Sequence, residues 1–127
     1  MTETVSEWVR LAEYDLGTAR AMLANGRYTY VLFCCEQAVE KALKAVIIFK
    51  TVKLPPRIHN LTRLAELAAL EPDDAARNLM ARLSAFYFQS RYPGKTEIPE
   101  GPAAGGHADT VLRQTEETVK WLLSILK

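Results

Sequence analysis

The most informative part of the sequence is the segment YTYVLFCCEQAVEKALKAVIIFK, residues 28–50. On a helical wheel its apolar residues recur at steps of three and four and cover about half of the circumference. So wide an apolar arc is typical of a helix with neighbours on several sides, and we expect this helix to lie at the centre of a bundle. The arc consists of Leu32, Cys35, Ala38, Val39, Ala42, Leu43, Ala45, Val46 and Phe49.

Four further helical patterns surround this segment, and no β-type alternation or internal repeat is evident. They are separated by Asn25-Gly26, by Leu54-Pro55-Pro56, where proline cannot continue a helix, and by a Gly/Pro-rich stretch at 93–106 that predicts a long surface loop. The sequence therefore predicts one all-α domain over residues 1–127, a four- to five-helix up-and-down bundle with antiparallel neighbours. The four flanking helices are expected at about 4–23, 60–70, 72–89 and 108–126.

The composition is that of a globular protein. Hydrophobic residues make up 49% and charged residues 24% of 127 residues, which fits one hydrophobic core and excludes a disordered chain. With 16 Lys+Arg against 15 Asp+Glu, the net charge provides no overall field that attracts nucleic acid or a membrane. Without a membrane span or a signal peptide in the sequence, we expect a cytoplasmic protein.

No metal or cofactor is expected. Cys34 and Cys35 are adjacent, so on a helix their side chains diverge by about 100° and do not form a bridge. They are interpreted as buried thiols. The two histidines, His59 and His107, do not combine with cysteines in zinc-ligand spacing. None of the usual phosphate-loop, dinucleotide, hydrolase or metalloprotease motifs occurs either.

Several polar residues occupy positions that need an explanation. Asp15 falls within the apolar face of the first helix and needs a cationic partner. It is either an anchor that fixes the register of the bundle or the carboxylate of a binding pocket. On the central helix one polar arc is either a solvated face or the border of a groove. That arc consists of Glu36, Gln37, Glu40, Lys41 and Lys44.

The segment FYFQSRYP, residues 86–93, combines aromatic side chains with a permanent cation. Arg91 stacks on rings and holds phosphate or carboxylate with two hydrogen bonds, so together with Tyr87 and Tyr92 it suits a nucleotide or an RNA end. In the alternative interpretation Tyr87 is a core residue and Arg91 pairs with Asp15 or a glutamate. His59, just before the third helix, is either a capping residue or a base.

The ordered set of these residues resembles the HEPN domain family of small helical proteins. The matching pieces span roughly residues 8 to 93. They are Trp8 with Ala12-Glu13-Tyr14-Asp15-Leu16 and Ala19; Tyr28 and Phe33 leading into residues 36–45; His59-Asn60-Leu61; and Tyr87 with Ser90-Arg91-Tyr92-Pro93.

The resemblance implies a bundle of about five helices, two of which pair as a homodimer. It also implies a partner nucleotidyltransferase in a system of the toxin–antitoxin type and binding of a nucleotide. Many members of the family are metal-independent endoribonucleases with an R-x(4–6)-H motif. Here the next histidine after Arg91 is His107, so the motif is not matched and the resemblance favours a protein without ribonuclease activity of the usual kind.

We therefore expect a dimeric HEPN-domain protein that binds a nucleotide or RNA and acts with a nucleotidyltransferase. An endoribonuclease with an atypical active site and a scaffold without a ligand site are the alternatives. Trp121 and Ile125, on the side of the last helix away from its main apolar stripe, suggest a dimer interface. The residues expected to converge on one binding groove are Asp15, Lys44, His59, Tyr87, Arg91 and Tyr92.

Overall fold

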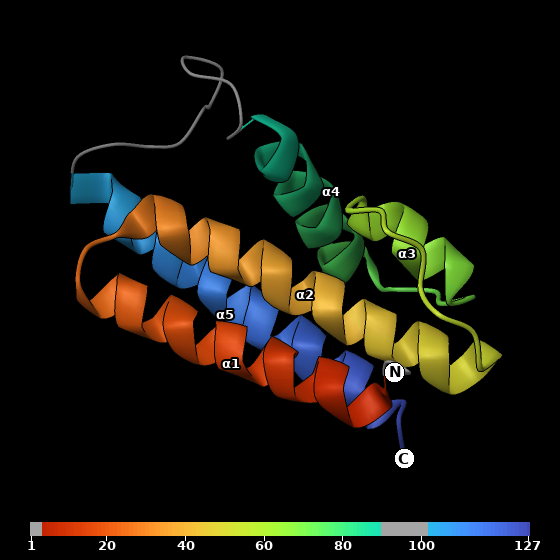
Figure 1. Ribbon diagram of the computed structural model, residues 1–127. Helices are drawn as coiled ribbons and strands as arrows, with labels where there is room; N and C mark the ends of the chain where they lie inside the picture. The colour runs from red at the N-terminus through yellow and green to blue at the C-terminus, as the bar shows by residue number, and fades with distance from the viewer. Residues whose placement is uncertain (1–3, 90–101) are drawn as a thin grey trace.

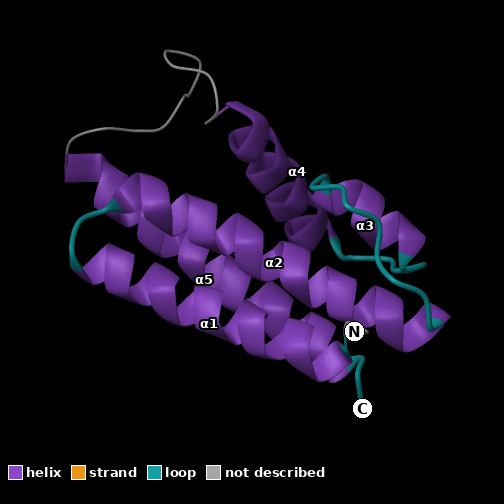
Figure 2. Cartoon of the chain, viewed as in Figure 1, coloured by secondary structure: helices purple, strands orange, loops and turns teal. Residues whose placement is uncertain are grey.

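A computed structural model describes residues 4–89 and 102–127 of the chain. These residues form helices joined by loops, with no strand among them (Figure 2). None of the helices within the described ranges is long and apolar enough to cross a membrane. The helices are α1 (Val5–Ala24), α2 (Tyr28–Thr51), α3 (Leu61–Leu67), α4 (Asp74–Gln89) and α5 (Pro102–Ser124).

The ends of the helices follow from capping residues in the sequence. Thr4 caps α1 by accepting a hydrogen bond from the backbone N–H of Glu7, and Asn60 caps α3 by accepting one from Arg63. Asp73 does the same for α4, since its Oδ1 accepts from the N–H of Ala76 at 2.8 Å. Gly26 adopts a positive φ of 71° in the turn between α1 and α2, a conformation that favours glycine.

The helix α2 lies at the centre, as its wide apolar arc predicts. It contacts each of the other four helices, and most of its residues from Val31 to Ile47 are buried. Its core residues pack against apolar side chains from α1, α3, α4 and α5. Because one helix supplies the inner surface for all of the others, polar residues on it are enclosed wherever a neighbour covers them.

The helices α1, α2 and α5 lie side by side along their length, and α3 and α4 cover another side of α2 (Figure 1). The helices α1 and α2 are antiparallel, as expected. In contrast, α5 runs parallel to α2, since both helices begin at the same end of the bundle (Figure 1). The bundle is thus not antiparallel at every interface.

The last helix begins earlier than the sequence predicts. The expected loop at 93–106 ends at Pro102, where α5 starts, and residues 93–101 lie outside the described part of the chain. Proline is well suited to the first turn of a helix. Gly105, which we interpreted as a loop residue, lies within α5 where a Cβ would come 2.9 Å from the hydroxyl of Tyr28. This glycine therefore permits a close approach between α5 and the first turn of α2.

The two apolar residues expected to remain exposed on α5 are instead partly covered. Trp121 and Ile125 are partly buried and pack against the core. The reason is that α5 contacts α1, α2 and α4, so that it buries more than one row of apolar residues. The dimer interface that we expected from these two side chains is therefore not supported by their exposure.

Both cysteines are buried thiols, and we expect them to react slowly. Burial raises the pKa of Cys34, and it raises the pKa of Cys35 to about 12. Because the thiolate is the reactive form, reaction near neutral pH requires opening of the core. A colorimetric thiol reagent should label native protein at least about a hundred times more slowly than protein in denaturant. Equal rates would mean that α2 is not buried in solution.

Candidate functional site

Glu40 is the centre of a polar cluster on the otherwise apolar helix α2. Its Oε2 accepts a hydrogen bond from Nζ of Lys44 at 3.1 Å, one turn further along the helix. The side chains are only 5% and 7% exposed. A buried ion pair of this kind stabilises little by itself, but losing one partner leaves an uncompensated charge in the core.

His59 connects Glu40 to the surface. Its Nδ1 lies 3.0 Å from Oε1 of Glu40, and 42% of its side chain is exposed. The histidine precedes α3, whose start is fixed to α4 because the N–H of Leu61 donates to Oγ of Ser84 at 2.9 Å. The backbone therefore holds the imidazole over the carboxylate.

Tyr87 of α4 forms one wall of the cluster. Its ring is buried and lies against the imidazole of His59, with 4.8 Å between ring centroids and 34° between ring planes. Phe88 also packs against Tyr87, in an edge-to-face arrangement. A surface-exposed imidazole thus rests on a rigid aromatic support.

Glu36 completes the cluster one turn before Glu40. It is fully buried; Nε2 of Gln37 donates to its Oε1 at 2.6 Å, and its Oε2 has no partner among the described residues. Burial, followed by the negative charge of Glu40, raises the pKa of Glu36 to about 9. Glu36 is therefore a neutral acid at pH 7. We call the five residues Glu36, Glu40, Lys44, His59 and Tyr87 the Glu40 cluster.

Trp8 of α1 closes the cluster on the side of Lys44. The ammonium of Lys44 lies 5.5 Å from the centroid of the Trp8 ring, within the range of a cation–π interaction. The same ammonium also bonds Glu40. The cation is therefore enclosed between a carboxylate and an aromatic face.

Asp15 finds its cation on α2. Its Oδ2 is 2.5 Å from Nζ of Lys41, and the two side chains are 16% and 20% exposed. This pair links α1 to α2 as a register anchor, which is one of the two interpretations of Asp15. The pairing with Arg91 is not observed, because Arg91 and Tyr92 lie outside the described residues.

Of the six expected site residues, the structure brings together Lys44, His59 and Tyr87. The sequence interpretation missed Glu36 and Glu40 as members of the site, because it placed them on a polar arc that is either solvated or borders a groove. The solvated interpretation is wrong for Glu36, Glu40 and Lys44, which are buried. Their spacing of four residues on so apolar a helix was the signal that could have identified them.

The chemistry available to the residues of the Glu40 cluster is proton transfer and hydrogen bonding. Within the described ranges no group of three or more His, Cys, Asp or Glu residues is arranged to hold a metal ion. A carboxylate only accepts hydrogen bonds, so in the bond between Glu40 and His59 the hydrogen is on Nδ1 of the histidine. The other ring nitrogen, Nε2, has no protein partner among the described residues. A carboxylate that orients a histidine in this way leaves Nε2 free to bind a ligand or exchange a proton.

The fold and this cluster define a class: a small all-α protein whose central helix carries buried carboxylates and an enclosed lysine beneath a surface histidine. The family model of the HEPN domain matches residues 5–126. The chain therefore belongs to the HEPN domain family, as its sequence resemblance predicts.

Solved structures show the same fold. The crystal structure of ST0689, an archaeal HEPN homologue, superposes with a TM-score of 0.78 at 25% sequence identity, covering 99% of this chain and 100% of that one. The crystal structure of TT1696 from Thermus thermophilus gives a TM-score of 0.74 at 24% identity over 96% of this chain and 98% of that one. No curated protein matches the sequence.

Proposed function

We propose that this HEPN-domain protein acts as a dimer that binds a nucleotide or an RNA end and works with a partner nucleotidyltransferase in a system of the toxin–antitoxin type. One observation carries the proposal: an exposed imidazole, His59, is held by Glu40 and packed against the ring of Tyr87. An aromatic surface combined with a hydrogen-bonding nitrogen suits a nucleobase or a ribose hydroxyl. In this proposal Arg91 and Tyr92, which follow α4 in the sequence, supply the phosphate contact and a second ring.

The dimer is supported by apolar side chains on the surface of α2. Tyr30 is 60% and Phe33 40% exposed, and residues three apart lie on the same side of a helix. HEPN domains are often dimeric. In the proposal these two aromatic residues lie in or beside the contact between the two copies.

The alternative of an endoribonuclease with an atypical active site is favoured by one feature, the bond between Glu40 and His59. A carboxylate behind a histidine stabilises the imidazolium that forms when Nε2 takes a proton. The described residues bring no second histidine into this bond network, since His107 lies on α5 without a hydrogen bond to it. We therefore place binding ahead of cleavage.

The binding proposal predicts that His59→Ala weakens binding of ATP or of a short labelled oligoadenylate by about tenfold, the effect of removing one base-stacking and hydrogen-bonding group. Titration calorimetry and filter binding measure the effect. The matched control is His107→Ala, which removes the other histidine and should change the affinity less than about twofold.

The binding experiment with labelled RNA also separates the binding protein, the ribonuclease and the scaffold. Intact RNA that is retained by the wild type and released by His59→Ala supports a binder, whereas RNA fragments that His59→Ala no longer produces support the ribonuclease. If neither ligand binds to the wild type, the protein is a scaffold without a site at the Glu40 cluster. Sedimentation of the same sample tests the dimer.

A further inference from the structure

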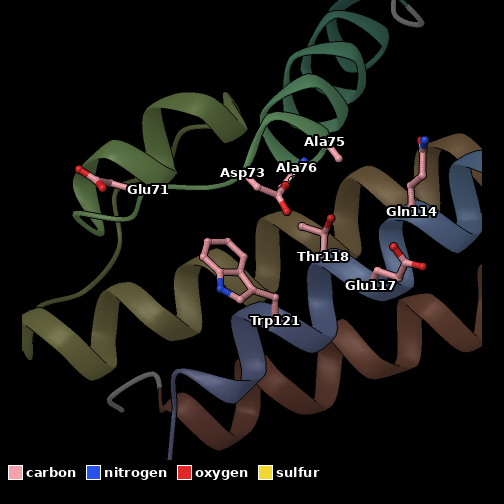
Figure 3. Close-up of a pocket in the computed structure, with 8 residues that line it drawn as sticks. All are labelled: Glu71, Asp73, Ala75, Ala76, Gln114, Glu117, Thr118 and Trp121. Carbon is pink, nitrogen blue, oxygen red and sulfur yellow. Dashed lines mark hydrogen bonds between the residues drawn. The ribbon is translucent and has the colours of Figure 1, made fainter.

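A pocket separate from the Glu40 cluster lies between the start of α4 and the outer surface of α5 (Figure 3). Its volume is about 240 Å³. This is below the roughly 300–1,000 Å³ typical of pockets for drug-sized molecules, so the pocket suits a ligand of a few non-hydrogen atoms. The residues that bear on its chemistry are Glu71, Asp73, Gln114, Glu117, Thr118 and Trp121.

The charged residues that line the pocket are all acidic. They are Glu71, Asp73 and Glu117, and none of them forms an ion pair with a described residue. Figure 3 shows the carboxylate of Asp73 on the α4 side and that of Glu117 on the α5 side, while Glu71 points away from the pocket. Two unpaired carboxylates on opposite sides of a small cavity favour a cation between them.

The neighbouring arginines do not neutralise this charge. Nη2 of Arg82 donates to Oε1 of Gln114 at 2.8 Å, and Nε of Arg77 donates to the carbonyl of Pro72 at 3.2 Å. Both guanidinium groups are therefore directed to neutral oxygens. The positive N-terminal end of α4 is capped by Asp73 itself. The negative charge of this cap reduces the preference of the helix end for an anion.

Thr118 provides an independent indication of a ligand. The residue is only 6% exposed, lines the pocket, and its hydroxyl forms no hydrogen bond with any residue in the described ranges. In Figure 3 the hydroxyl is directed between Asp73 and Gln114 into the pocket. The hydroxyl oxygen itself remains accessible from the pocket, so a donor that enters the pocket can supply the hydrogen bond that no described residue makes.

Trp121 supplies the apolar wall. Its indole lies below Thr118 and Asp73 on the floor of the pocket as drawn (Figure 3). Tryptophan is the side chain that attracts cations most strongly through its ring face, and its surface also accommodates methylene groups. The wall therefore suits a ligand that is both cationic and partly aliphatic.

We propose that this pocket binds a small alkylammonium compound, of the class of short aliphatic diamines. The carboxylates of Asp73 and Glu117 bind the ammonium groups, the hydroxyl of Thr118 accepts an N–H, and the methylene chain lies on Trp121. The site does not depend on the nucleotide function, because it shares no residue with the Glu40 cluster.

The test is a titration of ¹⁵N-labelled protein with butane-1,4-diamine at low ionic strength, where exposed charges are least screened. We expect a saturable shift of the indole N–H signal of Trp121, with the signal of Trp8 unchanged; Trp121→Phe assigns the two signals. Thr118→Val keeps the shape of the side chain and should weaken binding by about threefold to tenfold, the effect of one neutral hydrogen bond. Glu117→Gln should weaken it by about twofold to fivefold.

The controls vary the ligand and the protein separately. Butan-1-ol, which lacks the charge, should produce no saturable shift, and Glu13→Gln, an exposed glutamate on α1, should bind the diamine as the wild type does. His59→Ala should also retain diamine binding, which separates this site from the proposed nucleotide site. The proposal is overturned if the diamine gives no saturable shift at Trp121, if butan-1-ol binds equally well, or if Thr118→Val and Glu117→Gln both behave like Glu13→Gln.

Discussion

We expect the replacement of Lys44 with Met to lower the free energy of unfolding by about 3 kcal/mol, because it leaves the buried carboxylate of Glu40 without its ammonium partner. The Lys44 side chain is 7% exposed, so water does not readily take the place of its charge. Its aliphatic part is matched by the methionine side chain, which keeps the loss of packing small. Chemical denaturation followed by circular dichroism measures the change.

Two further variants show whether the charge is responsible. Lys120→Met removes an exposed lysine from α5 and should alter stability by less than about 0.5 kcal/mol. Adding Glu40→Gln to Lys44→Met removes the unpaired charge and should restore at least about half of the loss. If Lys44→Met alone were as stable as Lys120→Met, Glu40 and Lys44 would not be buried together in solution.

We expect the effect of Glu36→Gln on the free energy of unfolding to be about 3 kcal/mol more favourable at pH 7 than at pH 4. The pKa of Glu36 is about 9 in the folded chain against an ordinary value of 4.5. The stabilisation associated with its proton is therefore fully present below pH 4.5 and is lost as the pH rises towards 9. Each pH unit in this window costs the wild type about 1.4 kcal/mol, whereas glutamine is neutral throughout and also donates a hydrogen bond.

The measurement is the free energy of unfolding of wild type and Glu36→Gln at several pH values from about 4 to 9. The difference between the two proteins should widen steadily with pH, because the contributions of all other groups cancel. Glu13→Gln, which replaces an exposed glutamate, should give a curve parallel to that of the wild type. Parallel curves for Glu36→Gln would instead mean that Glu36 ionises normally and that water reaches the cluster.

The helices could be predicted from the sequence because local chemistry determines them. Capping by Thr4 and Asn60 and the apolar arc of residues 28–50 depend on neighbours within a few residues. The start of α5 could not be predicted in this way. A glycine is needed at position 105 because Tyr28, a residue far earlier in the chain, lies too close for a Cβ. In the sequence, a glycine that permits such a contact cannot be distinguished from one that forms a loop.

The site could be predicted only in part, for a related reason. The sequence did indicate Lys44 on the central helix, His59 before the third helix and Tyr87 in the aromatic segment. It does not show which elements cover the polar arc of α2. The segment before α3 places His59 on Glu40, and α4 places Tyr87 against His59. Only this tertiary arrangement turns a charged helix face into a buried network. For Asp15 the need for a cation was predictable, whereas the choice of Lys41 depends on the register between α1 and α2.

The parallel arrangement of α2 and α5 also has a consequence for the order of folding. The helices α1 and α2 are joined by a short turn at Asn25-Gly26, so they can associate as a hairpin at small entropic cost. The helix α5 must return across the whole segment from Val52 to Gly101 before it reaches α2. Its contacts have high sequence separation, which slows their formation. The hairpin is thus the natural nucleus, and the docking of α5 is the step that completes the core.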